Sequence, residues 1–126
     1  MNKIVTLLVL SAALGFSGRQ ASAEDGRHFV LTDWNAETVT LSTVDDGEIV
    51  IVSLPATGAA SISARIVEQA QMLADCEVRD IRTRGDRIEI MLKLGEANRD
   101  DGWNGCTAEI RGAGTLLVEF GFDIND

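Results

Sequence analysis

The sequence predicts an α+β fold: a mostly antiparallel sheet of about seven short strands with one helix at about residues 61–75. Two observations carry this prediction. Runs in which apolar and polar residues alternate recur along most of the chain, which is typical of strands with one buried face. Residues 61–75 instead place apolar side chains at helical spacing. The alternative is an all-β sandwich, in which this segment forms a strand and a loop.

Three strands are expected early in the chain, at residues 28–34, 37–44 and 48–54. The third contains the run Ile49–Val52, which is apolar on both faces and therefore predicts a central strand covered on each side. Asp45-Asp46-Gly47 precedes it and is typical of a hairpin turn. Pro55 follows and ends the strand, because proline has no N–H group to donate.

The segment 61–75 supports two interpretations. Its stripe of Ile62, Ile66, Ala70 and Leu73, with Ser61 as N-cap, favours a helix. Its first six residues also alternate as a strand would. Its second half consists of good helix formers, so a helix is the preferred interpretation.

Strands return from residue 76 onward, with alternating runs at 87–94, 106–111 and 115–122. Gly85-Asp86 and Gly112-Ala113-Gly114 are expected to be the turns between neighbouring strands. Each run has one apolar face, so the sheet is expected to bury one side and expose the other.

Residues 1–23 predict a signal peptide. Lys3 gives a positive start, residues 4–16 are apolar, and Ala21-Ser22-Ala23 is a small-x-small cleavage site. The apolar run is shorter than the ~20 residues of a membrane span. We therefore expect cleavage after Ala23, a periplasmic or secreted protein, and a mature chain, residues 24–126, that forms one disulfide-braced domain without a membrane span.

The two cysteines, Cys76 and Cys106, are expected to form a structural disulfide in an exported chain. Closing so long a loop contributes roughly 3–4 kcal/mol to stability. In a flat meander, the strands that begin at these cysteines would be two strand spacings apart, about 9–10 Å. This exceeds the usual Cα separation of roughly 4.4–6.8 Å. The second strand therefore lies either directly beside the first or in a facing layer.

The charge of the chain is strongly negative. The signal segment holds Lys3 and Arg19 and no acid, so nine of the 11 basic residues remain beside 20 acidic ones, a net charge of −11. Such a field repels nucleic acid and anionic lipid and favours a cationic protein partner. The arginines of residues 79–87 are interleaved with acids and predict a lattice of ion pairs, not a nucleic-acid surface.

The loop at residues 95–105 carries the candidate site residues. Trp103, Asp100, Asp101 and Asn104 are candidate partner contacts, and Trp103 either anchors a partner or covers the core. The oxygen ligands Glu96, Asn98, Asp100 and Asp101 are also candidates for binding calcium, although their spacing does not fit an EF-hand.

Catalytic machinery is sparse in the sequence. His28 is the one histidine, and no Gly-x-Ser-x-Gly elbow or zinc-ligand spacing occurs. The sequence therefore favours a non-enzymatic protein of the inhibitor, immunity or assembly-chaperone type that docks on another protein, with no catalytic residues and no cofactor. The first alternative is a calcium- or small-ligand-binding module that uses the 95–105 loop. A hydrolase with paired carboxylates is the less favoured third hypothesis.

Overall fold

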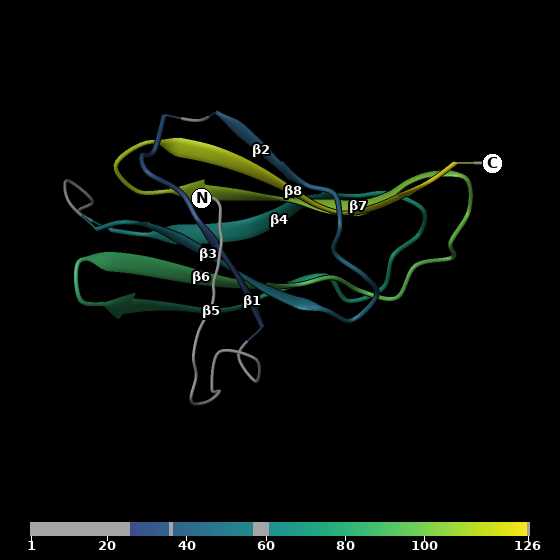
Figure 1. The fold of residues 1–126 in the computed structure, drawn as a ribbon, viewed down its shortest axis with the longest axis horizontal. Helices are drawn as coiled ribbons and strands as arrows, with labels where there is room; N and C mark the ends of the chain where they lie inside the picture. Colours follow the sequence, from purple (N-terminus) through teal and green to yellow (C-terminus); the bar gives the residue numbers. More distant parts are fainter. Residues whose placement is uncertain (1–25, 36, 57–60, 126) are drawn as a thin grey trace.

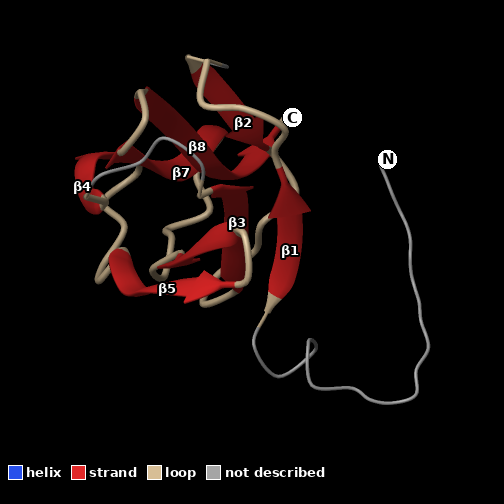
Figure 2. Ribbon diagram, turned by 90° about the vertical axis from the view of Figure 1, so that its left-hand side faces the viewer, coloured by secondary structure: helices blue, strands red, loops and turns tan. Residues whose placement is uncertain are grey.

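The computed structural model describes residues 26–35, 37–56 and 61–125, so the signal peptide predicted at 1–23 lies outside the described residues. Within these ranges the chain forms strands and loops and no helix (Figure 2). The eight strands are β1 (Arg27–Val30), β2 (Thr38–Leu41), β3 (Ile49–Pro55), β4 (Ser63–Gln69), β5 (Glu77–Arg84), β6 (Arg87–Lys93), β7 (Gly102–Arg111) and β8 (Thr115–Ile124).

The strands form two four-stranded sheets that face each other as two layers (Figure 1). One sheet has the order β1-β3-β6-β5 and the other has the order β2-β8-β7-β4. The pairs β1–β3 and β2–β8 are parallel, whereas the remaining pairs are antiparallel. Without β2, the neighbour order is that of immunoglobulin-type sandwiches. The parallel β1–β3 pair and the position of the disulfide differ from that pattern.

The core lies between the two sheets and is built by alternate residues of the central strands. Val50 and Val52 of β3 and Ile90 of β6 face Val118 and Phe120 of β8, all at most 1% exposed. The expectation that β3 is a central strand is confirmed, because it lies between β1 and β6. Trp34 is a further core residue, since it is 6% exposed and its Nε1 donates to the Pro55 carbonyl.

The prediction of a helix at 61–75 is wrong, and the predicted α+β fold class is therefore wrong as well. The all-β alternative is correct. Ser63–Gln69 forms β4, which pairs antiparallel with β7 and contains a bulge between Ile66 and Glu68. The helix preference of the later residues amounts to only tenths of a kcal/mol each. Pairing with β7 partly buries Ala64 and Ile66 on one side of the segment and overrides that preference.

The turn predictions have a mixed outcome. The Gly85-Asp86 turn joins β5 to β6, and residues 112–114 join β7 to β8, so both hairpins are confirmed. The hairpin predicted at Asp45-Asp46-Gly47 is wrong. A turn is present, but β2 and β3 belong to different sheets. The Asp-Gly sequence favours a local chain reversal, and Gly47 has φ 72°. It does not determine which strands pair.

Candidate functional site

The predicted 95–105 loop is shorter in the structure, because β7 begins at Gly102. Trp103 and Asn104 therefore belong to a strand, where they pair with Asp123 and Phe122 of β8. The glycines, asparagine and aspartates of this stretch are typical turn residues, so the sequence predicted a loop where the strand begins. Glu96, Asn98, Asp100 and Asp101 remain in the connection between β6 and β7, and all four are exposed.

The predicted contact residues Asn104 and Trp103 are occupied within the protein. Asn104 is 0% exposed, and its side-chain amide donates to the carbonyl oxygens of Asp100 at 2.8 Å and Gly102 at 3.0 Å. Trp103 is half-buried, and its ring covers Gly105, where an added Cβ would lie 2.4 Å from the ring. Asn104 thus holds the loop in place, and Trp103 covers its own strand.

The four candidate calcium ligands lie in one connection, between β6 and β7, and calcium binding there stays a prediction. Within the described ranges, no group of three or more histidine, cysteine, aspartate or glutamate residues is arranged to hold a metal ion. Over the same residues, no helix has the length and hydrophobicity of a membrane span.

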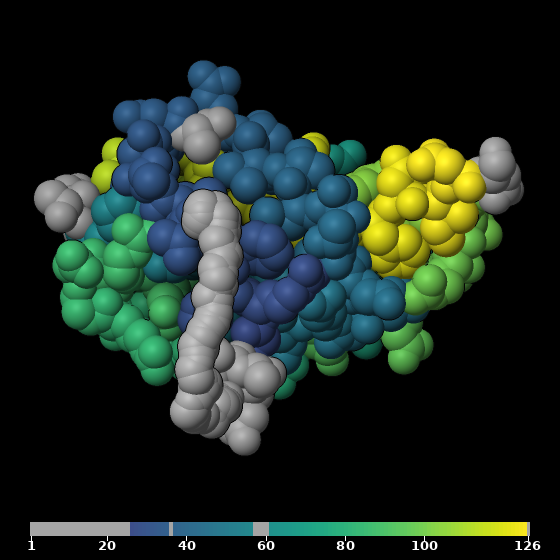
Figure 3. Space-filling model, in the orientation of Figure 1, coloured from purple at the N-terminus to yellow at the C-terminus, as the bar shows by residue number. Residues whose placement is uncertain are grey.

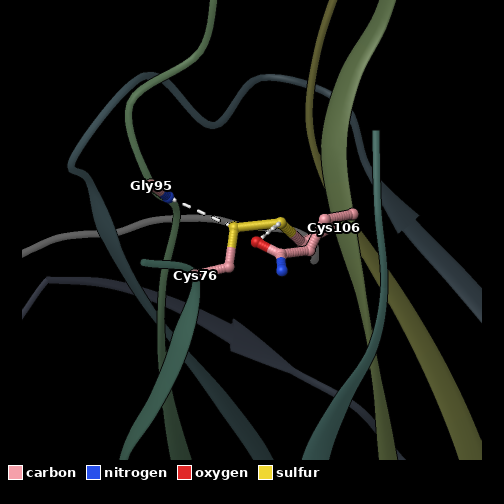
Figure 4. The surroundings of a disulfide bond; sticks show 4 residues. Cys76, Gly95 and Cys106 are labelled. Atoms are coloured by element: carbon pink, nitrogen blue, oxygen red, sulfur yellow. Dashed lines mark hydrogen bonds between the residues drawn. A yellow bond between two sulfur atoms is a disulfide. The ribbon is translucent and has the colours of Figure 1, made fainter. Parts of the chain in front are cut away.

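The disulfide joins the two sheets (Figure 4). Cys76 immediately precedes β5 of one sheet and Cys106 lies within β7 of the other, with 6.8 Å between their Cα atoms. This confirms the facing-layer alternative. The N–H group of Gly95 donates to the Cys76 sulfur at 3.3 Å. Position 95 requires glycine, because a Cβ there would lie 1.5 Å from the carbonyl oxygen of Ala74.

The loop from residue 70 to residue 76, between β4 and β5, is anchored along its length. At its start the Ala70 N–H donates to the Gly105 carbonyl at 2.8 Å, and the Gln71 side chain donates to the Asp101 carbonyl at 2.9 Å. Further along, Leu73 is 6% exposed, Ala74 forms a β-bridge with Glu96, and the disulfide fixes the end.

Met72 projects from the middle of this anchored loop. It is 84% exposed, compared with 67% for Val30 and 44% for Val67. The exposure of Met72 was not predicted from the sequence, because residue 72 was expected to lie within the helix at 61–75. No local signal marks the turn, since neither Gln71 nor Met72 is a residue that favours a left-handed backbone.

The backbone of this end of the molecule is strained. Among the described residues, five non-glycine residues have positive φ, and four of them lie in these connections: Gln71 at 59°, Met72 at 50°, Asp75 at 60° and Arg99 at 61°. Each costs roughly 1–2 kcal/mol relative to the right-handed conformation. Strained residues of this kind persist only where the surrounding structure holds them, and they cluster at functional sites.

Arg99 ties the β6–β7 connection to the rest of this end. Its guanidinium binds the carboxylates of Asp45 and Asp46 and lies over the Phe122 ring, 4.9 Å from the centroid. The pKa of Asp45 is lowered, first by the hydrogen bond that its carboxylate accepts from the Asp46 N–H, then by Arg99. We call the assembled region, residues 42–48, 70–76 and 94–104 with the end of β8, the disulfide end.

The disulfide end is the right-hand end of the molecule in Figure 3, where residues of β8 lie beside those that precede β7. A pocket of about 190 Å³ opens in it. Its lining residues are Gly47, Ala74, Asp75, Lys93, Leu94, Gly95 and Glu96. The arrangement offers an anchored surface with one largely exposed apolar side chain, Met72, which is suited to contact with another macromolecule.

Comparisons with known proteins assign no family. No family model matches the chain, and no curated protein matches it. A cysteine protease inhibitor from Entamoeba histolytica is 13% identical, with 75% of this chain and 95% of that chain covered, at a TM-score of 0.32. An endo-fucoidan hydrolase of glycoside hydrolase family 107 is 12% identical, with 94% of this chain and 16% of that chain covered, at a TM-score of 0.31. At these TM-scores neither likeness assigns a fold family or a function to this chain.

Proposed function

We propose that this chain is a small exported protein that binds another protein through the disulfide end, without catalysis. Inhibitors, immunity proteins and assembly chaperones are the classes that this activity covers. The observation that carries the proposal is Met72, which is 84% exposed on a turn that the disulfide and two backbone hydrogen bonds, Ala70 to Gly105 and Ala74 to Glu96, hold in a left-handed conformation.

An exposed apolar side chain alone is unremarkable on a protein surface. Here the exposure coincides with backbone strain at Gln71, Met72 and Asp75, and the sandwich holds the strained turn through the disulfide and the Ala74–Glu96 bridge. A loop that is already rigid loses little conformational entropy when a partner binds it. Methionine is also enriched in protein–protein interfaces. These features support a presented docking loop.

The test uses the mature, disulfide-bonded chain immobilised against the periplasmic or secreted fraction of its own cells. Wild-type protein is compared with Met72→Ala and with Val30→Ala, a matched control on β1 that is also exposed. We expect Met72→Ala to weaken capture of a specific partner about tenfold, the size typical of an interface anchor. We expect Val30→Ala to leave it unchanged. Absence of any captured partner, or equal capture by all three proteins, would refute the proposal.

A further inference from the structure

We propose that Met72 is an oxidation site, at which a peroxide converts the thioether to methionine sulfoxide while the protein stays folded. The reaction transfers one oxygen atom and two electrons. The sulfur attacks one peroxide oxygen, an S–O bond forms as the O–O bond breaks, and the leaving hydroxide takes the proton of the transferred hydroxyl group to become water. The sulfur is oxidised and the peroxide is reduced, so the reaction needs no other reactant.

Met72 is the more accessible of the two methionines that lie within the described residues. It is 84% exposed in the loop between β4 and β5. Met91 is half-buried in the inner strand β6, where it pairs with Ile51 of β3 and Asp80 of β5. Because a peroxide must reach the sulfur to react, the folded protein is expected to oxidise first at Met72.

No free thiol competes with Met72 for the oxidant. The chain has two cysteines, Cys76 and Cys106, and the disulfide holds both of them. A free thiolate is the stronger nucleophile toward peroxides and would otherwise react first. With both cysteines already oxidised, the methionine thioethers are the sulfur atoms left for a two-electron oxidant, and Met72 is the largely exposed one.

Oxidation of Met72 is expected to leave the fold intact. The loop is held by the backbone hydrogen bonds of Ala70 and Ala74 and by the disulfide, and none of these contacts uses the side chain of residue 72. The neighbouring Leu73 provides the apolar contact with the core, since it is 6% exposed. A sulfoxide oxygen at residue 72 therefore stays in water, whereas in a core it would disrupt packing.

The consequence for docking rests on the proposed function. Methionine sulfoxide is polar, and burying its oxygen in an apolar interface without a hydrogen-bond donor is unfavourable. Oxidation of Met72 therefore weakens binding of the partner without unfolding the domain. The site then acts as a redox switch on docking, in which a local change of polarity controls an interface.

The first experiment treats the mature, disulfide-bonded protein with hydrogen peroxide. Peptide mass spectrometry measures the rate at which each methionine gains one oxygen atom. We expect Met72 to react about tenfold faster than Met91 in the folded protein, and the two to react at similar rates in concentrated urea. Equal rates in the folded protein, or faster oxidation of Met91, would overturn the proposal.

The second experiment uses two variants that each keep one methionine in the mature chain. Met91→Leu keeps Met72 and Met72→Leu keeps Met91, and exchange of methionine for leucine conserves the side-chain volume. After peroxide treatment, Met91→Leu is expected to bind the captured partner about tenfold more weakly and to keep its Tm within about 2 °C. Treated Met72→Leu is expected to bind as it did before treatment.

Failure of this inference can be told apart from failure of the proposed function. Undiminished partner binding by Met91→Leu that carries the sulfoxide overturns the redox switch. A large fall in the Tm of that protein overturns the local effect, because weaker binding would then reflect unfolding. If untreated Met72→Ala captures the partner as well as wild type does, the proposed function fails, and the two oxidation rates still decide whether Met72 is the oxidation site.

Discussion

Replacing Met72 by glycine is expected to stabilise the protein while it weakens binding about as much as Met72→Ala does. Met72 has φ 50°, which costs a non-glycine residue roughly 1–2 kcal/mol and costs glycine almost nothing. Glycine also makes the unfolded chain more flexible, which offsets about 0.5–1 kcal/mol of this gain. Because the side chain is 84% exposed, its removal forfeits little buried surface. The net expectation is a gain of about 0.5–1 kcal/mol, or roughly 2–8 °C in Tm.

The assay is urea and thermal unfolding of the disulfide-bonded protein, followed by the fluorescence of Trp34 and Trp103. Met72→Ala is the matched control, because alanine removes the side chain and keeps the strain. Its stability should stay within about 0.5 kcal/mol of wild type. A Met72→Gly protein that is less stable than Met72→Ala would refute the reasoning, since it would show that the turn is unstrained.

Three further predictions concern the disulfide, the ion pair of Glu109 with Arg111, and calcium binding. Cys76→Ser/Cys106→Ser should lower the free energy of unfolding by about 3–4 kcal/mol in urea titrations, and a loss below about 1 kcal/mol would contradict a role as the main brace. Arg111 lowers the pKa of Glu109, so the favourable interaction is present above the unfolded-state pKa and is lost as pH falls through the folded-state pKa. Arg111→Ala should raise the pKa of Glu109 in an NMR titration, and an unchanged pKa would exclude this ion pair as the cause. Calorimetric titration with calcium should give no heat and no change in Tm, whereas binding that disappears when the acids of the 94–101 connection are neutralised would favour the calcium alternative.

The parts of the fold that local chemistry determines could be predicted from the sequence. The turn at Gly85-Asp86 joins two neighbouring runs that pair with each other, so local sequence was enough to predict its hairpin. The same reasoning failed at Asp45-Asp46-Gly47, because the strands on either side of that turn belong to different sheets. The apolar run in β3 indicated a central strand, because both of its faces are apolar and need to be covered. The cysteine pair gave a long-range constraint, because the disulfide's reach excluded a flat meander.

The rest depended on contacts between distant parts of the chain. Residues 61–75 carry helix formers, and the pairing of β4 with the distant strand β7 decides that Ser63–Gln69 is a strand. The exposure of Met72 also depends on distant contacts, so it could not be predicted from the sequence. Met72 is exposed because it lies in a left-handed turn that the backbone hydrogen bonds of Ala70 and Ala74 hold in place. No residue in the turn is of a type that favours this conformation.

The parallel pairing of β2 with β8 has a consequence for how the protein reaches its native state. β2 is the second strand of the chain and β8 is the eighth, and the hydrogen-bonded side chains of Thr40 and Glu119 are 79 positions apart. Contacts of such high sequence separation must close a long loop before they contribute, which makes folding slow. Among the described strands β2 pairs only with β8, so it cannot dock in its sheet until β8 has been made. Docking of β2 therefore follows the synthesis of β8, whereas the sheet β1-β3-β6-β5 does not depend on that strand for its own pairing.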